Sequence, residues 1–188
     1  MRKLILGLVL CGSAAMAQDD GPGPNLVIEV AGEANGRIVI DLLPDVAPAH
    51  VEQITGLAEE GAYDDVAFHR VIEGFMAQTG DVEFGKASDY SNMAGRGGST
   101  RPDLPAEFSD IPYERGVVGM ARARNPNSGN SQFFIMFAPA PGLNGQYTVF
   151  GRVIEGMDVV DAIKRGSASQ NGVVASEPDR MVSVTVER

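Results

Sequence analysis

The segment Phe68–Asp81, FHRVIEGFMAQTGD, places a histidine, an arginine, a glutamine and several large apolar residues close together in the chain. His69 and Arg70 could act as an acid–base pair, because imidazole titrates near neutral pH and lies beside a permanent charge. The alternative for Arg70 is an ordinary surface charge on the polar side of a strand. The alternative for His69 is a structural residue, so the surrounding sequence has to decide between these interpretations.

Several common chemistries have no support in the sequence. There is no P-loop, and Gly95–Gly98 is not preceded by a strand and followed by a helix as a dinucleotide site requires. The chain has only two histidines, His50 and His69, which is too few for a clustered zinc site. No G-x-S-x-G nucleophile motif occurs. We therefore expect neither a metal nor another cofactor.

The first seventeen residues have the pattern of a secretory signal. Residues 1–17, MRKLILGLVLCGSAAMA, begin with basic residues, continue with the apolar run Leu4–Cys11 and end in the small-residue motif Ala15–Ala17. The apolar run is shorter than the ~20 residues that a membrane span needs, so no membrane anchor is expected. We predict a signal peptide over 1–17 and export to a bacterial periplasm, with secretion as the alternative.

The alternative for this region is a lipoprotein signal using Cys11, which is disfavoured because bulky Leu10 precedes the cysteine. Cleavage after residue 17 would remove the only cysteine and leave thirteen basic residues against twenty-five acidic ones. Such an acidic balance argues against nucleic acid or an anionic membrane as a general partner, since both need basic patches. The mature chain is predicted to consist of a flexible leader, 18–25, and one domain, 26–188.

The domain contains many short strands and two helices. Apolar spacing and turn residues predict helices over Pro48–Glu60 and Asp158–Lys164. The predicted strands are Leu26–Val30, Arg37–Leu42, Val66–Ile72, Phe75–Gln78, Gly116–Ala121, Phe133–Phe137, Tyr147–Val153 and Met181–Val186. A glycine-rich loop extends over Gly80–Pro112, and we expect its Val82–Ala94 part to be mobile. This mainly β pattern indicates an antiparallel barrel or sandwich.

Three blocks of sequence then point to a family. They are Phe68–Ile72 with Gly74–Met76, Gln78 and Gly80–Asp81; Gly119–Arg122 with Ser131–Ile135; and Leu143–Val153 with Gly156–Val160. Together they resemble the cyclophilin-type peptidyl-prolyl isomerases, and the resemblance extends from Leu26 to Val186. It implies a closed eight-stranded antiparallel β-barrel capped by two α-helices, and a monomeric enzyme that acts on proline-containing polypeptides.

The resemblance also assigns roles within the site. Arg70 and Gln78 would be catalytic, and Gln132 would support the arginine. The residues implied to bind substrate are His69, Phe75, Met76, Ala121, Arg122, Ala123, Gln132, Phe134, Leu143 and Tyr147. His69 has the weakest claim, since strand alternation predicts that Phe68, Arg70 and Ile72 share one face while His69 and Val71 point to the other.

The chain departs from the family pattern at the pocket. It has no tryptophan, and Pro141-Gly142 precedes Leu143 where many members have an aromatic residue, so we expect weak binding of cyclosporin. Tyr147 stands where many members have histidine. Two functions remain open: an isomerase that accelerates folding of exported proteins, and a peptide-binding or chaperone module that uses the same barrel without catalysis.

Overall fold

A computed structural model of the chain describes residues 21–188. The predicted signal peptide and the first part of the predicted leader lie outside the described residues. Residues 21–24 lie against the second strand, where the Leu42 amide donates to the Pro24 carbonyl over 3.1 Å. Within 21–188, no helix is long and apolar enough to cross a membrane.

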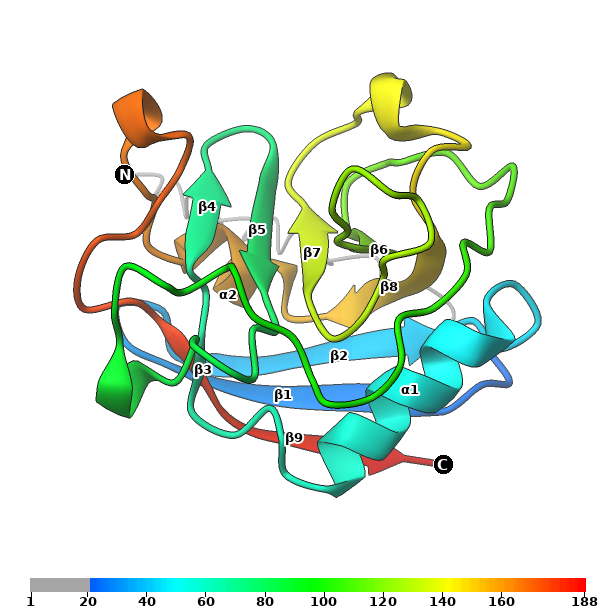
Figure 1. Cartoon of the computed structure of the whole chain (residues 1–188), viewed down its shortest axis with the longest axis horizontal. Coiled ribbons are helices and arrows are strands. Elements are labelled where there is room, and N and C mark those ends of the chain that lie inside the picture. Colours follow the sequence, from blue (N-terminus) through cyan, green and yellow to red (C-terminus); the bar gives the residue numbers. More distant parts are fainter. Residues whose placement is uncertain (1–20) are drawn as a thin grey trace, which may run out of the picture.

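Nine strands and two α-helices form the described part of the chain (Figure 1). The strands are β1 Asn25–Ala31, β2 Gly36–Leu42, β3 Val66–Ala67, β4 Arg70–Ile72, β5 Met76–Thr79, β6 Val117–Met120, β7 Phe133–Met136, β8 Val149–Glu155 and β9 Arg180–Glu187. The helices are α1 Pro48–Glu59 and α2 Met157–Ala162, and the 3₁₀ helices are η1 Ala87–Asp89, η2 Pro141–Leu143 and η3 Ala168–Gln170. All eight predicted strand regions contain strand, and both predicted helices are present.

The strands form one antiparallel sheet in the order β3-β9-β1-β2-β8-β6-β7-β5-β4. The expected closed eight-stranded barrel is therefore corrected to a curled nine-stranded sheet with β3 and β4 at its two ends. The extra strand arises because the predicted strand Val66–Ile72 divides at Phe68-His69. Its first half pairs with β9 and its second half pairs with β5. The chain thus crosses from one end of the curled sheet to the other within two residues.

This division also corrects the predicted alternation. Phe68 and Val71 both belong to the main core, whereas Ile72 packs against a separate apolar cluster. Arg70 and Ile72 share a face within β4, as predicted, but Phe68 does not share it because the strand is interrupted between Phe68 and Arg70.

The main core fills the inside of the curled sheet. Phe133 contacts Tyr63 and Phe150 edge-on, with ring centroids 5.8 and 6.1 Å apart. The Tyr63 hydroxyl donates to the Ser131 carbonyl over 2.8 Å, so this buried polar group is satisfied. α1 packs on β9 with its apolar face, α2 lies next to β2, and buried residues of both helices belong to this same core.

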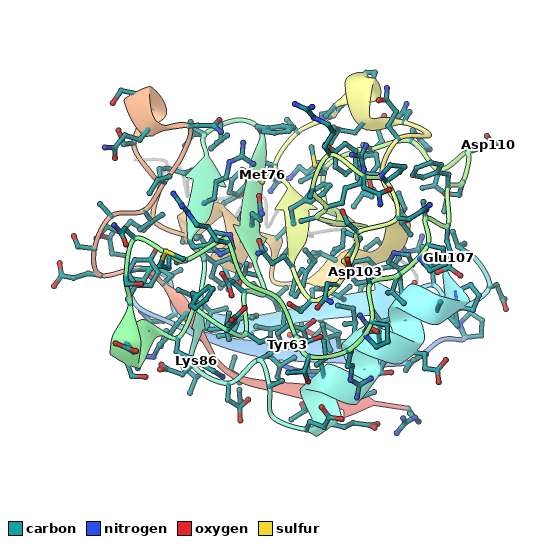
Figure 2. The ribbon with its side chains drawn as sticks, viewed as in Figure 1. Tyr63, Met76, Lys86, Asp103, Glu107 and Asp110 are labelled. Carbon is teal, nitrogen blue, oxygen red and sulfur yellow. The ribbon has the colours of Figure 1, made fainter. Side chains whose placement is uncertain are left out.

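α1 begins at Pro48, a residue whose fixed φ favours the first helical position. No side chain of the preceding residue caps it. Instead Glu107, from a distant loop, accepts hydrogen bonds from the Ala49 and His50 amides and from the His50 ring, the last over 2.6 Å. Figure 2 shows Glu107 beside the first turn of the helix. Burial acts to raise the pKa of Glu107, but these hydrogen bonds hold it below its ordinary value.

The long loop after β5 is tied down at several points. Asp81 accepts four backbone N–H donors, two on each carboxylate oxygen. Lys86 donates to the carbonyls of Ala62 and Asp64, and the Tyr90 hydroxyl donates to the Val174 carbonyl over 2.7 Å. These anchors tie the loop to the rest of the domain, and the mobility of Val82–Ala94 stays a prediction.

Candidate active site

A cavity of about 180 Å³ opens on the separate cluster beside β4, β5 and β7; six of its nine lining residues are apolar or aromatic, and it is called the apolar cavity below. Its lining consists of Arg70, Phe75, Met76, Gln78, Ala121, Arg122, Phe134, Leu143 and Tyr147. Each of these residues was predicted to belong to the site from the sequence. The structure therefore brings together residues that are separated by as many as 77 positions in the chain.

Three neighbouring strands place the central side chains on one face. Arg70 on β4 is the cross-strand partner of Gln78 on β5, and Gln78 is in turn the partner of Phe134 on β7. Directly opposed residues in adjacent strands project to the same side of a sheet. Met76, two residues before Gln78, lies on the same face near the upper end of β5 in Figure 2. The row combines a cation, an amide and an aromatic ring.

The Arg70 guanidinium is held by neutral acceptors. Nη1 donates to Gln78 Oε1 over 3.1 Å, Nε to the Asn171 carbonyl over 3.0 Å, and Nη2 to Asn171 Oδ1 over 3.1 Å. Ion pairs elsewhere in residues 21–188 involve other basic residues. Burial lowers the pKa of Arg70 somewhat, and Tyr147 opposes that shift, yet an arginine remains charged at any physiological pH. The charge is thus not neutralised by a carboxylate.

Gln132 supports the arginine indirectly. Gln78 Nε2 donates to Gln132 Oε1 over 3.0 Å, and Gln132 Nε2 donates to the Gly97 carbonyl over 2.7 Å. The Gly97 amide donates to the Asp81 carboxylate over 3.0 Å, and this bond is the last in the series. The predicted support for Arg70 therefore passes through Gln78 and begins at a buried carboxylate that the sequence did not single out.

His69 does not join the cavity. Its side chain is buried, with 4% of the residue exposed, and neither ring nitrogen has a hydrogen-bond partner of normal geometry among the described residues. Burial, helped by the Arg70 charge and opposed by Asp81, lowers the pKa of His69 to about 4. The ring is packed against Gly95, where an added Cβ would lie 2.8 Å from it. The structure places this predicted substrate contact in a structural position and leaves no acid–base pair with Arg70.

A second, larger cavity of about 430 Å³ adjoins the first and shares Gln78, Ala121 and Arg122 with it. Ala123 and Gln132 line this second cavity rather than the apolar one. The Ala121 amide already donates to the Gln132 carbonyl and the Ala123 amide to Ser128 Oγ. These two N–H groups are therefore already bonded within the protein, and the backbone carbonyls are the other main-chain groups by which this segment could bind substrate.

Arg122 stands between the two cavities and is fixed there. Its guanidinium lies 4.3 Å from the centre of the Tyr147 ring, and Nη2 donates to the Gln146 carbonyl over 2.9 Å. Tyr147 in turn meets Phe134 edge-on at 5.9 Å. A tyrosine at this position thus completes the cavity wall with its ring, as expected for an aromatic substitute for histidine.

Tyr113 was not predicted from the sequence, although it supports the cavity from behind. Its ring stacks on Phe134 with centroids 5.7 Å apart and planes 25° apart. The hydroxyl occupies the space left by Gly119, where an added Cβ would lie 2.4 Å from it. Burial raises the pKa of the Tyr113 hydroxyl. A tyrosine next to a glycine-containing strand carries no sequence signal for this contact.

Comparison with known proteins agrees with this geometry. A family model described as cyclophilin type peptidyl-prolyl cis-trans isomerase/CLD matches residues 26–186. The chain belongs to the cyclophilin-type peptidyl-prolyl cis-trans isomerases. A probable peptidyl-prolyl cis-trans isomerase of Brucella suis biovar 1 (strain 1330) is 53% identical over 186 residues, covering 98% of this chain and 90% of the relative. An Arabidopsis thaliana isomerase of the same family is 31% identical, covering 96% of this chain and 80% of its own length.

Solved cyclophilins share the fold. The chain is similar to a cyclophilin from Hirschia baltica with a TM-score of 0.71 and 27% identity, covering 89% of this chain and 75% of that one. A Cryptosporidium parvum cyclophilin, crystallised in the presence of the dipeptide Ala-Pro, gives a TM-score of 0.73 and 25% identity, covering 87% and 99%. Family membership and these relatives identify the chain as a peptidyl-prolyl cis-trans isomerase.

Proposed function

We propose that this enzyme binds the proline ring of a polypeptide in the apolar cavity and that Arg70 donates to the imide nitrogen as the X–Pro bond twists. The observation that carries the proposal is a guanidinium that lines the apolar cavity and is held by amide and carbonyl oxygens, with no carboxylate of residues 21–188 bonded to it.

The chemistry needs no nucleophile or base. The barrier to rotation, ~18–20 kcal/mol, exists because the amide nitrogen shares its lone pair with the carbonyl. When the bond twists, the lone pair returns to the nitrogen and can accept a hydrogen bond, which a planar imide nitrogen does poorly. A donor that binds the twisted state better than either planar isomer lowers the barrier. Arg70 supplies such a donor without exchanging a proton with substrate.

Apolar and polar walls divide the remaining work. The proline ring would be surrounded by four apolar side chains, those of Phe75, Met76, Phe134 and Leu143. The Gln78 side chain lines both cavities. In this proposal the apolar cavity takes proline and the larger polar cavity takes residues on the amino-terminal side of it. The Cryptosporidium parvum relative was crystallised in the presence of the dipeptide Ala-Pro. Longer proline-containing peptides are the substrates proposed for this chain.

A protease-coupled assay with a proline tetrapeptide tests the proposal. Wild-type protein should accelerate isomerisation, and Arg70→Ala should lose about 10²–10³-fold in kcat/KM, as is typical when a transition-state donor is removed. Circular dichroism must show that the variant is folded. Full activity in folded Arg70→Ala would overturn the mechanism. Tight peptide binding without acceleration by wild-type protein would instead favour the peptide-binding or chaperone module.

We further propose that the enzyme is exported and accelerates slow X–Pro steps in the folding of exported proteins, steps that otherwise take tens to hundreds of seconds. The support is the sequence of residues 1–17, with its basic start, apolar run and Ala15–Ala17 ending. Cell fractionation with amino-terminal sequencing should find a periplasmic chain beginning at Gln18. A cytoplasmic chain that retains residues 1–17 would contradict export.

A further inference from the structure

The loop after α2 covers the free edge of β4 and is bound to it by backbone hydrogen bonds. The Val71 amide donates to the Gly172 carbonyl over 2.7 Å, and the Gly166 amide donates to the Val71 carbonyl over 2.9 Å. A third bond joins the Val174 amide to the His69 carbonyl over 3.0 Å. The segment that carries Asn171 is therefore fixed to the same strand that carries Arg70.

Asn171 lies directly after the η3 helix in this loop. Its φ of 54° is in the left-handed region, which asparagine tolerates better than most residues. Gly172 follows with a φ of 80°, and a Cβ added there would lie 2.3 Å from Ile72 Cγ1. This close approach sets the Asn171 backbone so that its carbonyl and its side-chain oxygen both face the Arg70 guanidinium.

The hydrogen bonds of Arg70 can be counted. A guanidinium has five N–H groups. Asn171 occupies the one on Nε and one of two on Nη2, and Gln78 occupies one of two on Nη1. One N–H on each terminal nitrogen therefore remains without a hydrogen-bond partner among residues 21–188. Both holding residues are uncharged, so the arginine keeps its full charge for substrate.

We propose that Asn171 is a positioning residue that sets the plane of the Arg70 guanidinium through two neutral acceptors, leaving two N–H groups and an uncompensated charge to act on the twisting bond. The inference rests on the catalytic role proposed for Arg70. A carboxylate in the same place would hold the plane equally well but would neutralise the charge, which is the physical reason for an amide here.

Three substitutions separate these effects. Asn171→Gly keeps the left-handed backbone and the carbonyl but removes Oδ1, and kcat should fall about tenfold, as expected for one hydrogen bond to a charged group. Asn171→Asp keeps the acceptor and adds a charge, and kcat should fall at least as far. Glu177→Gly is the matched control, because Glu177 also has a positive φ, of 47°, and lies outside both cavities. It should retain wild-type kcat.

The measurements are kcat from the exchange rate of a bound proline peptide by NMR and the peptide Kd from titration. Both Asn171 variants should keep Kd within about twofold, because the planar peptide does not depend on the donor. Unchanged kcat in Asn171→Gly would overturn positioning, and wild-type kcat in Asn171→Asp would overturn the need for a neutral acceptor.

An Arg70→Ala background keeps this test distinct from that of the proposed function. If Arg70→Ala keeps only the residual rate expected after a loss of about 10²–10³-fold, adding Asn171→Gly should not lower that residual rate further, since Asn171 acts through Arg70. A further loss would overturn the positioning role while the proposed function stands. If Arg70→Ala is fully active, the proposed mechanism itself fails.

Discussion

Arg70 and Gln78 are direct cross-strand partners on β4 and β5, and the arginine Nη1 donates to the glutamine Oε1 over 3.1 Å. The backbone pairing fixes both Cα positions, and this hydrogen bond acts together with the two bonds to Asn171 to hold the guanidinium beside the cavity. Gln78 also lines the larger cavity and bonds to Gln132. The Gln78 side chain therefore connects the Arg70 guanidinium to the larger cavity, which would hold the rest of the peptide.

Truncation of the cavity wall should weaken substrate binding with little effect on stability. Leu143 is partly buried and lines the apolar cavity. In Leu143→Ala, KM should rise about fivefold, because part of the apolar surface that covers the proline ring is removed. Val182→Ala is the control, since Val182 is an apolar residue 45% exposed on β9 and outside the cavity. Equal KM values for both variants would count against the pocket assignment.

Loss of the Asp81 charge should destabilise the loop after β5, whose backbone N–H groups donate to this carboxylate. Each Asp81 oxygen accepts two backbone N–H groups, so in Asp81→Asn the new NH₂ must face two donors. We expect a decrease of about 3 kcal/mol in the free energy of unfolding, measured in urea. Asp89→Asn, on the exposed η1 helix of the same loop, should change it by less than about 0.5 kcal/mol. A similar small change in both variants would show that the four contacts are weak.

A side chain added at Gly119 should displace Phe134, which lines the apolar cavity. A Cβ on Gly119 would lie 2.4 Å from the Tyr113 hydroxyl and 2.6 Å from Phe134 Cζ. Gly119→Ala should therefore cost about 1–3 kcal/mol of stability and raise KM by displacing Phe134. Adding Tyr113→Phe removes the nearer atom, so the double variant should recover part of both losses. No recovery would mean that the strain is not relieved at Tyr113.

His69 should make the fold less stable in mild acid. Its pKa is about 4 in the folded chain and near 6.5 in the unfolded chain. Between pH 6.5 and pH 4 the unfolded state therefore binds a proton at His69 that the folded state does not bind. Stability is fully present above pH 6.5 and falls as the pH drops towards 4. Between pH 7 and pH 5 the loss should be about 2 kcal/mol.

Urea unfolding of wild type and His69→Gln at both pH values measures this loss. The carboxyl groups with lowered pKa values, Asp65, Glu107 and Asp161, contribute losses only as the pH falls below about 4.5. The difference between pH 7 and pH 5 should therefore shrink in the variant. An identical difference in both proteins would show that His69 does not titrate as its burial requires.

Much of the fold followed from sequence patterns because they are local. The Pro48 start and Gly61 stop of α1, and the β-branched runs, are determined by neighbouring residues. The division of Val66–Ile72 into β3 and β4 could not be read in this way. It depends on which distant strand each half meets, and apolar residues on both sides of the break give the same pattern as a continuous strand.

The candidate site shows the same division. Residues within the family-like blocks, such as Arg70 and Phe134, were predicted and lie together. Asn171 and Tyr113 were missed because each contacts a residue that is distant in the sequence. Neither residue type indicates from the sequence which residue it will contact. His69 had the weakest claim among the implied contacts because of strand alternation, and it lies outside the lining of both cavities.

The most direct test of the account separates turnover from binding in Arg70→Ala. NMR exchange between the cis and trans forms of a bound proline peptide gives the catalysed rate, and titration of the same sample gives Kd. We predict that the rate falls about 10²–10³-fold while Kd changes by less than about threefold, because Arg70 acts on the twisted bond. A folded variant that keeps its rate, or one that loses binding and rate in equal proportion, would contradict the role assigned to Arg70.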